Sequence, residues 1–401
     1  MTRAIVYLDT QDYSRLADAV AGRGQADLLP VYDQLRKFAR EGVVEFCFSY
    51  MIVSELLQLN PSDIEIARRK ASVVEELCGA HAFPNIFWLL SADLTAAARG
   101  RGIATKASPN LEKIVFGGQW IRTELADLEE MFVAFDERVA SAANSEMTTA
   151  LGRVPNRKDR RRFAKPHSIE IAQRIVAESP FYPVIKGTPL QGKFVDALRR
   201  KKMPEVAEDF FRFLALPTRL VLSHDYVHSM TFLNIQLDTL KEAMFVGMAR
   251  LRDEFDSVRR ARGVPISRSQ REEMLKQPLE EHLVSLTRKL KAHLVRYGVP
   301  TEYFDHPQFN DDVARLPFLS TWRDLMTPYL LMVTEEEAMR RTLQRSDIVD
   351  LMHAMYAPHC AVWRSDRYFA GLATPVARAL GCRVVSRLAD LPLMLASMPS
   401  R

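Results

Sequence analysis

The hydrophobic pattern near the N-terminus predicts short buried strands that alternate with amphipathic helices. Residues 4–8 form an apolar run without polar alternation, which is typical of a strand buried on both faces of a parallel sheet, and the run ends at Asp9. Residues 28–40 carry apolar side chains at helical spacing, and a second strand is expected over 43–48. Ser49 is placed to cap a following helix that carries Glu55.

The same alternation returns at residue 346, with a helix expected over 347–356, a strand over 360–363, a helix over 367–380 and a strand over 382–385. Between residues 62 and 345 the pattern is helical, and only 85–90 resembles a strand. The long helices are expected over 120–143, 204–216, 224–258 and 269–297. We therefore predict an α/β fold with a central parallel sheet, formed by residues 1–61 and 346–401 and split by a mainly α-helical insertion, 62–345.

The composition places the chain among folded globular proteins. Its 401 residues are 47% hydrophobic and 26% charged, which excludes disorder, collagen and a coiled-coil fibre. The four cysteines are far apart and form no Cys-x-x-Cys pair, which favours core thiols in a reducing compartment. The apolar run at the N-terminus is too short for a signal peptide, and no stretch approaches the roughly 18 to 20 apolar residues of a membrane span. We expect a cytoplasmic protein with no membrane partner.

Four acids follow or flank the predicted strands: Asp9, Glu55, Asp347 and Asp366. Ligands of α/β sheets bind at the carboxyl ends of the strands, so acids there are candidates for function. Carboxylates gathered without basic partners repel one another, and a shared divalent cation removes that cost. Hard oxygen ligands suit Mg²⁺ or Mn²⁺, which activate water and polarise a phosphodiester. Taken singly, each acid is more often a turn or cap residue.

The motifs around these acids resemble those of PIN-domain nucleases, over roughly the first 60 and last 55 residues. The matching segments are Val6-Tyr-Leu-Asp9-Thr10 with Tyr13 and Leu16-Ala17, then Ser54-Glu55, then Asp347-Ile-Val-Asp-Leu-Met-His-Ala354, then Ser365-Asp366-Arg-Tyr-Phe369. Two positions differ from the usual pattern: Gln11 replaces an Asn, and Trp363-Arg364-Ser365 replaces a Thr before the last Asp.

The resemblance implies a PIN-like three-layer fold and a Mg²⁺- or Mn²⁺-dependent endonuclease, with RNA as the expected polymer. Asp9, Glu55, Asp347 and Asp366 would be both catalytic residues and metal ligands. Asp347 is assigned as the third acid because it lies 19 residues before Asp366, close to the family's spacing, whereas Asp350 lies 16 before it. Asp350 is then an auxiliary ligand or a helix-surface charge, and Asp12 an exposed charge at a helix start.

The net charge of +5 and three basic stretches, 153–165, 199–202 and 259–262, suggest contact with a phosphate backbone. A solvated surface explains such runs equally well. The candidate nucleic-acid-binding residues in the first stretch are Arg157, Lys158, Arg160, Arg161, Arg162 and Lys165.

Other interpretations stay open. The chain could be a non-catalytic PIN-like scaffold that binds nucleic acid or protein through its basic insertion. A HAD-type phosphatase is disfavoured because Gln11 stands where that chemistry needs a second Asp. His224 and His228 share a helix face, but the segment lacks the Glu of a zinc-protease helix, so a metal-binding role is disfavoured. His353 is best interpreted as a core histidine or as one that supports a ligand. A regulatory protein partner and oligomerisation are also open.

Overall fold

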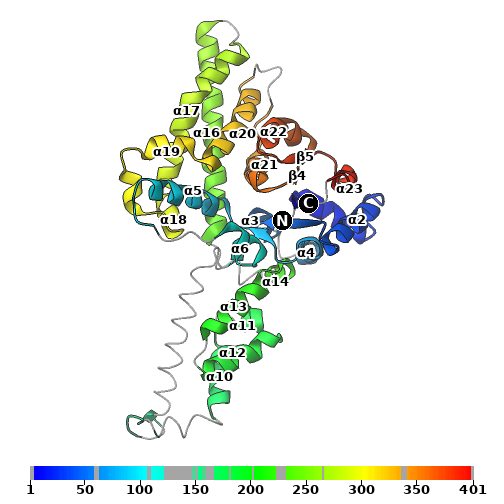
Figure 1. Ribbon diagram of the computed structural model, residues 1–401, viewed down its shortest axis with the longest axis vertical. Helices are drawn as coiled ribbons and strands as arrows, with labels where there is room; N and C mark the ends of the chain where they lie inside the picture. The colour runs from blue at the N-terminus through cyan, green and yellow to red at the C-terminus, as the bar shows by residue number, and fades with distance from the viewer. Residues whose placement is uncertain are drawn as a thin grey trace.

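The structure is a computed structural model, shown in Figure 1, in which five parallel strands form one sheet in the order β3-β2-β1-β4-β5. It describes residues 4–57, 63–105, 110–121, 148–149, 152–156, 158, 167–179, 182–200, 203–222, 232–263, 266–335 and 341–398. The strands are β1 Ala4–Tyr7, β2 Val44–Ser49, β3 Ala82–Phe83, β4 Val362–Arg364 and β5 Arg383–Val385.

The sheet is built from both ends of the chain. The central strand β1 pairs with β2 on one side, with Tyr7 opposite Cys47, and with β4 on the other, with Tyr7 opposite Trp363. Residues near position 5 and near position 363 are thus neighbours in space. This confirms the predicted α/β class and the parallel sheet shared by the two ends of the chain.

Helices cover the sheet in a pattern that follows from its strand order. Right-handed crossovers place the helices between β1, β2 and β3 on one face, and those that precede β4 and β5 on the other (Figure 1). The first group is α1 Thr10–Val20, α2 Leu28–Arg40, α3 Tyr50–Leu57 and α4 Ile64–Cys78; the second is α21 Arg345–Ala354 and α22 Arg367–Ala379. The predicted helix over 28–40 matches α2 in its bounds, and Gly42 ends it with a φ of 64°.

The strand expected over 85–90 is wrong, because that segment starts a helix. Asn85 caps α5 (Ile86–Gly100), its side-chain oxygen accepting a hydrogen bond from the backbone N–H of Trp88 at 2.9 Å. The first residues of α5 are all apolar and all buried. The run therefore lacks the spacing of apolar and polar residues that identifies an amphipathic helix in a sequence. The strand of this region is β3, just before Asn85 and beyond the sheet boundary predicted at residue 61.

The rest of the described chain is mainly helical. The remaining elements are α6 Leu111–Phe116, α10 His167–Ala177, α11 Tyr182–Ile185, α12 Pro189–Arg200, α13 Met203–Leu214, α14 Pro217–Leu222, α16 Phe232–Arg262, α17 Arg268–Lys289, α18 Lys291–Arg296, η2 Thr301–Asp305, α19 Phe309–Arg315, α20 Pro317–Val333, η3 Ala357–His359, η4 Leu388–Asp390 and α23 Leu391–Ala396. The helix expected over 269–297 is two helices, α17 and α18, that meet at Leu290. Among the described residues, no helix combines the length and apolar character that a bilayer crossing requires.

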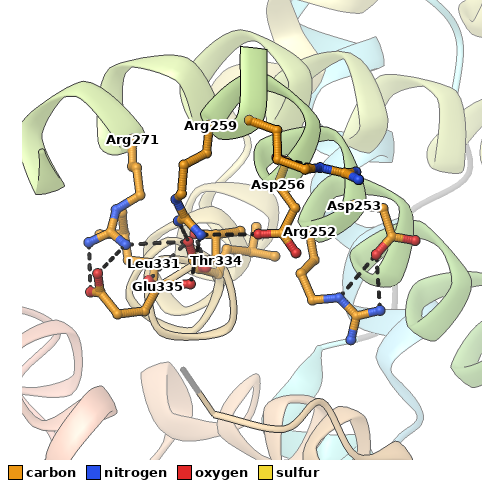
Figure 2. Close-up of polar contacts among 10 residues, drawn as sticks. Arg252, Asp253, Asp256, Arg259, Arg271, Leu331, Thr334 and Glu335 are labelled. Atoms are coloured by element: carbon orange, nitrogen blue, oxygen red, sulfur yellow. Dashed lines mark hydrogen bonds and ion pairs between the residues drawn. The ribbon is translucent and has the colours of Figure 1, made fainter. Parts of the chain in front are cut away.

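Two arginines hold the C-terminal end of α20 against α16 and α17 (Figure 2). Arg271, only 3% exposed, donates to both carboxylate oxygens of Glu335 at 2.5 and 2.6 Å. Arg259 and Arg271 also donate to the carbonyl oxygen of Thr334, at 2.8 and 3.3 Å. Cations at this position neutralise the negative end of the helix dipole and satisfy its last carbonyl groups. Arg259, part of the predicted basic stretch 259–262, therefore has a structural role.

Candidate functional site

Two of the predicted acids lie at neighbouring strand ends, where each begins a helix. Asp9 follows β1 and caps α1, its carboxylate accepting a hydrogen bond from the backbone N–H of Gln11 at 3.3 Å. Asp366 follows β4 and caps α22, where it accepts from the N–H of Phe369 at 2.7 Å. Because β1 and β4 are adjacent and parallel, both carboxylates lie at the same edge of the sheet.

Asp12 is buried, so its assignment as an exposed charge is wrong. Its Oδ2 accepts a hydrogen bond from the backbone N–H of Asp9 at 3.2 Å, closing a capping box, and its Oδ1 lies 2.9 Å from Nη2 of Arg364. Burial raises the pKa of Asp12 to about 7, with a further contribution from Asp9 and a partial offset from Arg364. The helix-start position gives no sign of this burial, because the partner lies on a strand more than 350 residues away.

Glu55 on α3 reaches the same edge and is held there by two hydrogen bonds. Its Oε2 accepts from the hydroxyl of Thr10 and lies 3.3 Å from Nε2 of His353. Burial would raise the pKa of Glu55, but the bonds to His353 and Thr10 outweigh it and lower that pKa below its usual value. Glu55 is therefore kept ionised.

His353 is 3% exposed and links Glu55 to the core. Its Nδ1 lies 2.5 Å from the hydroxyl of Tyr7, which in turn lies 2.6 Å from the hydroxyl of Ser49. Burial alone would lower the pKa of His353, but Glu55, Asp9 and Asp350 together raise it. The imidazole thus supports a carboxylate at the site, in keeping with its interpretation from the sequence.

The two aspartates of α21 have different surroundings. Asp347 is 1% exposed and already paired: Arg341 contacts both of its oxygens, at 2.7 and 3.3 Å, and Tyr329 donates to its Oδ2 at 2.7 Å. Asp350 is mostly buried, and its pKa is raised to about 7 by burial and then by Asp9, with Asp366 and Glu55 adding to the effect. The partners of Asp347 favour Asp350 as the residue of this helix that is left to bind a cation, whereas the 19-residue spacing favoured Asp347.

The helical region packs against the helix that carries Asp350. Helix α16 packs against α21, and Arg345 of α21 binds both oxygens of Glu242 at 3.0 Å. The neighbouring Lys241 is near enough for its positive charge to lower the pKa of Glu55. No motif marks Lys241, since its place at the site depends on how the insertion folds back over the sheet domain.

Carboxylate oxygens, which Mg²⁺ and Mn²⁺ prefer as ligands, come from four residues at this edge of the fold. In the part of the chain that the structure describes, no three His, Cys, Asp or Glu side chains form a group that could hold a metal ion. Asp350, however, has no hydrogen-bond or ion-pair partner among the described residues, and the charges of Asp9, Asp366 and Glu55 raise its pKa while that of His353 lowers it. The residues that would hold Mg²⁺ or Mn²⁺ are Asp9, Asp350 and Asp366, with Glu55 beside them.

The other candidate residues lie mostly outside the described part of the chain. Of the six basic residues predicted to bind nucleic acid, only Lys158 is described, and it is exposed. Arg157, Arg160, Arg161, Arg162 and Lys165 lie outside the described residues, as do His224 and His228.

Comparison of the chain with protein-family models, curated protein sequences and solved structures finds no match.

Proposed function

We propose that the protein is a PIN-like nuclease that hydrolyses phosphodiester bonds, RNA being the preferred polymer, with Mg²⁺ or Mn²⁺ held by acids at the carboxyl edge of its sheet. The observation that carries the proposal is Asp350, a mostly buried carboxylate with no ion-pair partner among the described residues, whose pKa the charges of Asp9, Asp366 and Glu55 raise. Such a group is costly unless a cation joins it, so its retention beside three other acids favours a binding role.

The roles follow from the contacts of each residue. A bound divalent cation would lower the pKa of a water molecule and neutralise charge on the phosphate. Asp9, Asp350 and Asp366 would provide its oxygen ligands. Glu55, kept ionised through Oε2 by Thr10 and His353, would accept a proton from the attacking water through its other oxygen, Oε1. Lys241 would attract the phosphate group that is cleaved.

Cleavage of labelled single-stranded RNA and DNA tests this proposal. The native protein is compared with folded Asp9→Asn and Asp366→Asn variants in Mn²⁺, Mg²⁺ or EDTA. We expect cutting that needs the metal and falls at least about 100-fold in each variant, since each removes a charged ligand. Equal cutting by native protein and variants, or cutting in EDTA, would contradict the proposal.

A second candidate is a non-catalytic scaffold that keeps the acids for structure. It is favoured by the internal partners of the acids: Asp9 and Asp366 cap helices, and Arg364 neutralises Asp12. In that case nucleic acid would bind without being cut, binding would weaken steeply with salt, and the Asp9→Asn and Asp366→Asn variants would bind as well as the native protein.

A further inference from the structure

A pocket lies toward the amino ends of the strands, away from the acids of the candidate site. One wall is formed by Ile5 and Glu45, which are in register on β1 and β2, and by Phe83 of β3. Ile5 precedes Tyr7 by two residues and therefore shares its face of the sheet, the face that α21 covers. The pocket has a volume of about 560 Å³, which is within the range of small-molecule sites.

Two short helical segments complete the pocket. Leu111, Val115 and Phe116 of α6 line it, as does His359 of η3, the segment that follows α21. The rings of His81 and Phe116 meet edge to face, with their centroids 5.3 Å apart. Aromatic and aliphatic side chains thus give the pocket an apolar surface that suits an aromatic body.

Carboxylates dominate the polar part of the lining. Glu45 and Glu112 each contribute one, and the described lining contains no Lys or Arg. Oε2 of Glu45 lies 3.2 Å from Nδ1 of His81, so these two side chains hold each other in place. The backbone N–H of Glu112 donates to Oδ1 of Asn110 at 2.8 Å, which fixes the first turn of α6. The described lining is therefore acidic, although the whole chain has a net charge of +5.

His359 adds a neutral hydrogen-bonding group. Burial lowers the pKa of its imidazole, so the ring is uncharged near neutral pH. The ring packs against Phe83, with centroids 6.0 Å apart, and its nitrogens make no hydrogen bond or ion pair within the described residues. A neutral imidazole has one nitrogen that accepts a hydrogen bond, and a ligand with N–H groups would satisfy it.

We propose that this pocket binds a small aromatic primary amine in its ammonium form. The ammonium group has three N–H donors and a positive charge, which match the carboxylates of Glu45 and Glu112 and the imidazole of His359. The aromatic body would lie against Phe83 and Phe116. An anionic ligand would instead be repelled by both glutamates. The pocket shares no lining residue with the acids at the carboxyl edge, so the inference does not depend on the proposed nuclease activity.

The test uses three probes that share a phenylethyl body and differ in their head group: phenylethylammonium, phenylethanol and phenylpropanoate. Their binding to the full-length chain is measured by isothermal titration calorimetry at neutral pH. We expect the ammonium probe to bind with a Kd below about 1 mM and the alcohol and the carboxylate at least about tenfold more weakly, because only the ammonium matches the charge of the pocket.

Variants show whether the probe binds in this pocket. Glu45→Gln removes one carboxylate and should weaken binding of the ammonium probe at least about tenfold. Leu111→Trp fills the pocket, keeps its charges and should abolish binding. Glu41→Gln, at an exposed glutamate just after α2, is the matched control and should bind like the native protein.

Three results would overturn the inference: no detectable binding of the ammonium probe, equal affinity for the three probes, or an affinity that either folded pocket variant leaves unchanged. If Glu45→Gln does not fold, Leu111→Trp decides whether the probe occupies the pocket.

Discussion

The hydroxyl oxygen of Tyr7 lies 2.5 Å from Nδ1 of His353, although the two residues are 346 positions apart in the chain. Tyr7 ends β1 and His353 lies on α21, so this contact joins the N-terminal and C-terminal parts of the sheet domain. Through Nε2 of the same imidazole, the link continues to Glu55. A buried chain of hydrogen bonds therefore connects the core of the fold to its candidate site.

Replacing Tyr7 with Phe should weaken both the fold and metal binding. The change leaves Ser49 and His353 without their shared partner, which costs about 1 to 3 kcal/mol of unfolding free energy. Loss of a group that orients a side chain next to a metal site commonly costs about 10- to 100-fold in affinity. Urea unfolding and Mn²⁺ titration measure the two effects.

Tyr13→Phe is the matched control for this variant. Tyr13 is equally buried, but its hydroxyl lies 3.3 Å from the sulfur of Cys78, away from His353. We expect some loss of stability and unchanged Mn²⁺ affinity. Equal losses of affinity in the two tyrosine variants would show that the effect comes from general loosening of the core.

The two aspartates of α21 should behave differently when each is changed to Asn. Asp347→Asn weakens the contacts with Arg341 and Tyr329 and should cost about 2 kcal/mol or more of stability, while Mn²⁺ affinity changes little. Asp350→Asn should abolish Mn²⁺ binding without loss of stability in the metal-free protein. The reverse pattern, with binding lost in Asp347→Asn, would restore the assignment made from sequence spacing.

The metal-free protein should lose stability with rising pH because of Asp350. Its pKa is about 7 in the folded state against a usual value of 3.8, so the folded chain binds this proton more tightly than the unfolded chain. The stabilisation is complete below about pH 4 and is lost as the pH rises to about 7. Asp350→Asn should therefore be more stable than the native protein at pH 8 and similar to it at pH 4.

Chemical unfolding at several pH values in EDTA measures this difference, with the exposed Asp18→Asn as the control variant. Added Mn²⁺ should restore stability to the native protein at pH 8 but not to Asp350→Asn. A stability difference that does not change between pH 4 and pH 8 would show that Asp350 is not held among the other acids.

Arg271→Met should destabilise the helical region. The change leaves Glu335 without its paired donors and the carbonyl group of Thr334 with one donor fewer, at a cost of about 2 kcal/mol or more. Arg252 in Figure 2 is the control, because its ion pair with Asp253 is exposed and should be worth less than about 1 kcal/mol. If the same change to Met at Arg252 and at Arg271 gave similar midpoints of thermal unfolding, the structural role of Arg271 would be contradicted.

The sheet was predictable from sequence because its strands are short apolar runs that end at polar residues. The sequence predicts β1, β2, β4 and β5, and the placement of Asp9 and Asp366 follows from their positions after β1 and β4. Strand β3 was missed because it has only two residues and precedes an all-apolar helix. A pattern that depends on alternation with polar residues gives no signal in such a segment.

The remaining site residues depend on tertiary contacts that no local pattern encodes. Asp347 and Asp350 lie three residues apart on one helix, and only the position of Arg341 shows which of them is already paired. Asp12 is buried because Arg364 reaches it from another strand, and Lys241 is present because α16 packs on α21. Motif spacing predicts which helix carries an acid, whereas packing determines which acid on that helix faces the site.

The most direct test of the metal site is anomalous diffraction from crystals of the full-length protein soaked in Mn²⁺. We predict one anomalous peak at the carboxyl edge of the sheet, about 2.1 Å from oxygens of Asp9, Asp350 and Asp366, and no peak in crystals of Asp350→Asn. No peak at this edge in the native protein, or a peak that Asp350→Asn leaves unchanged, would contradict the proposed metal site.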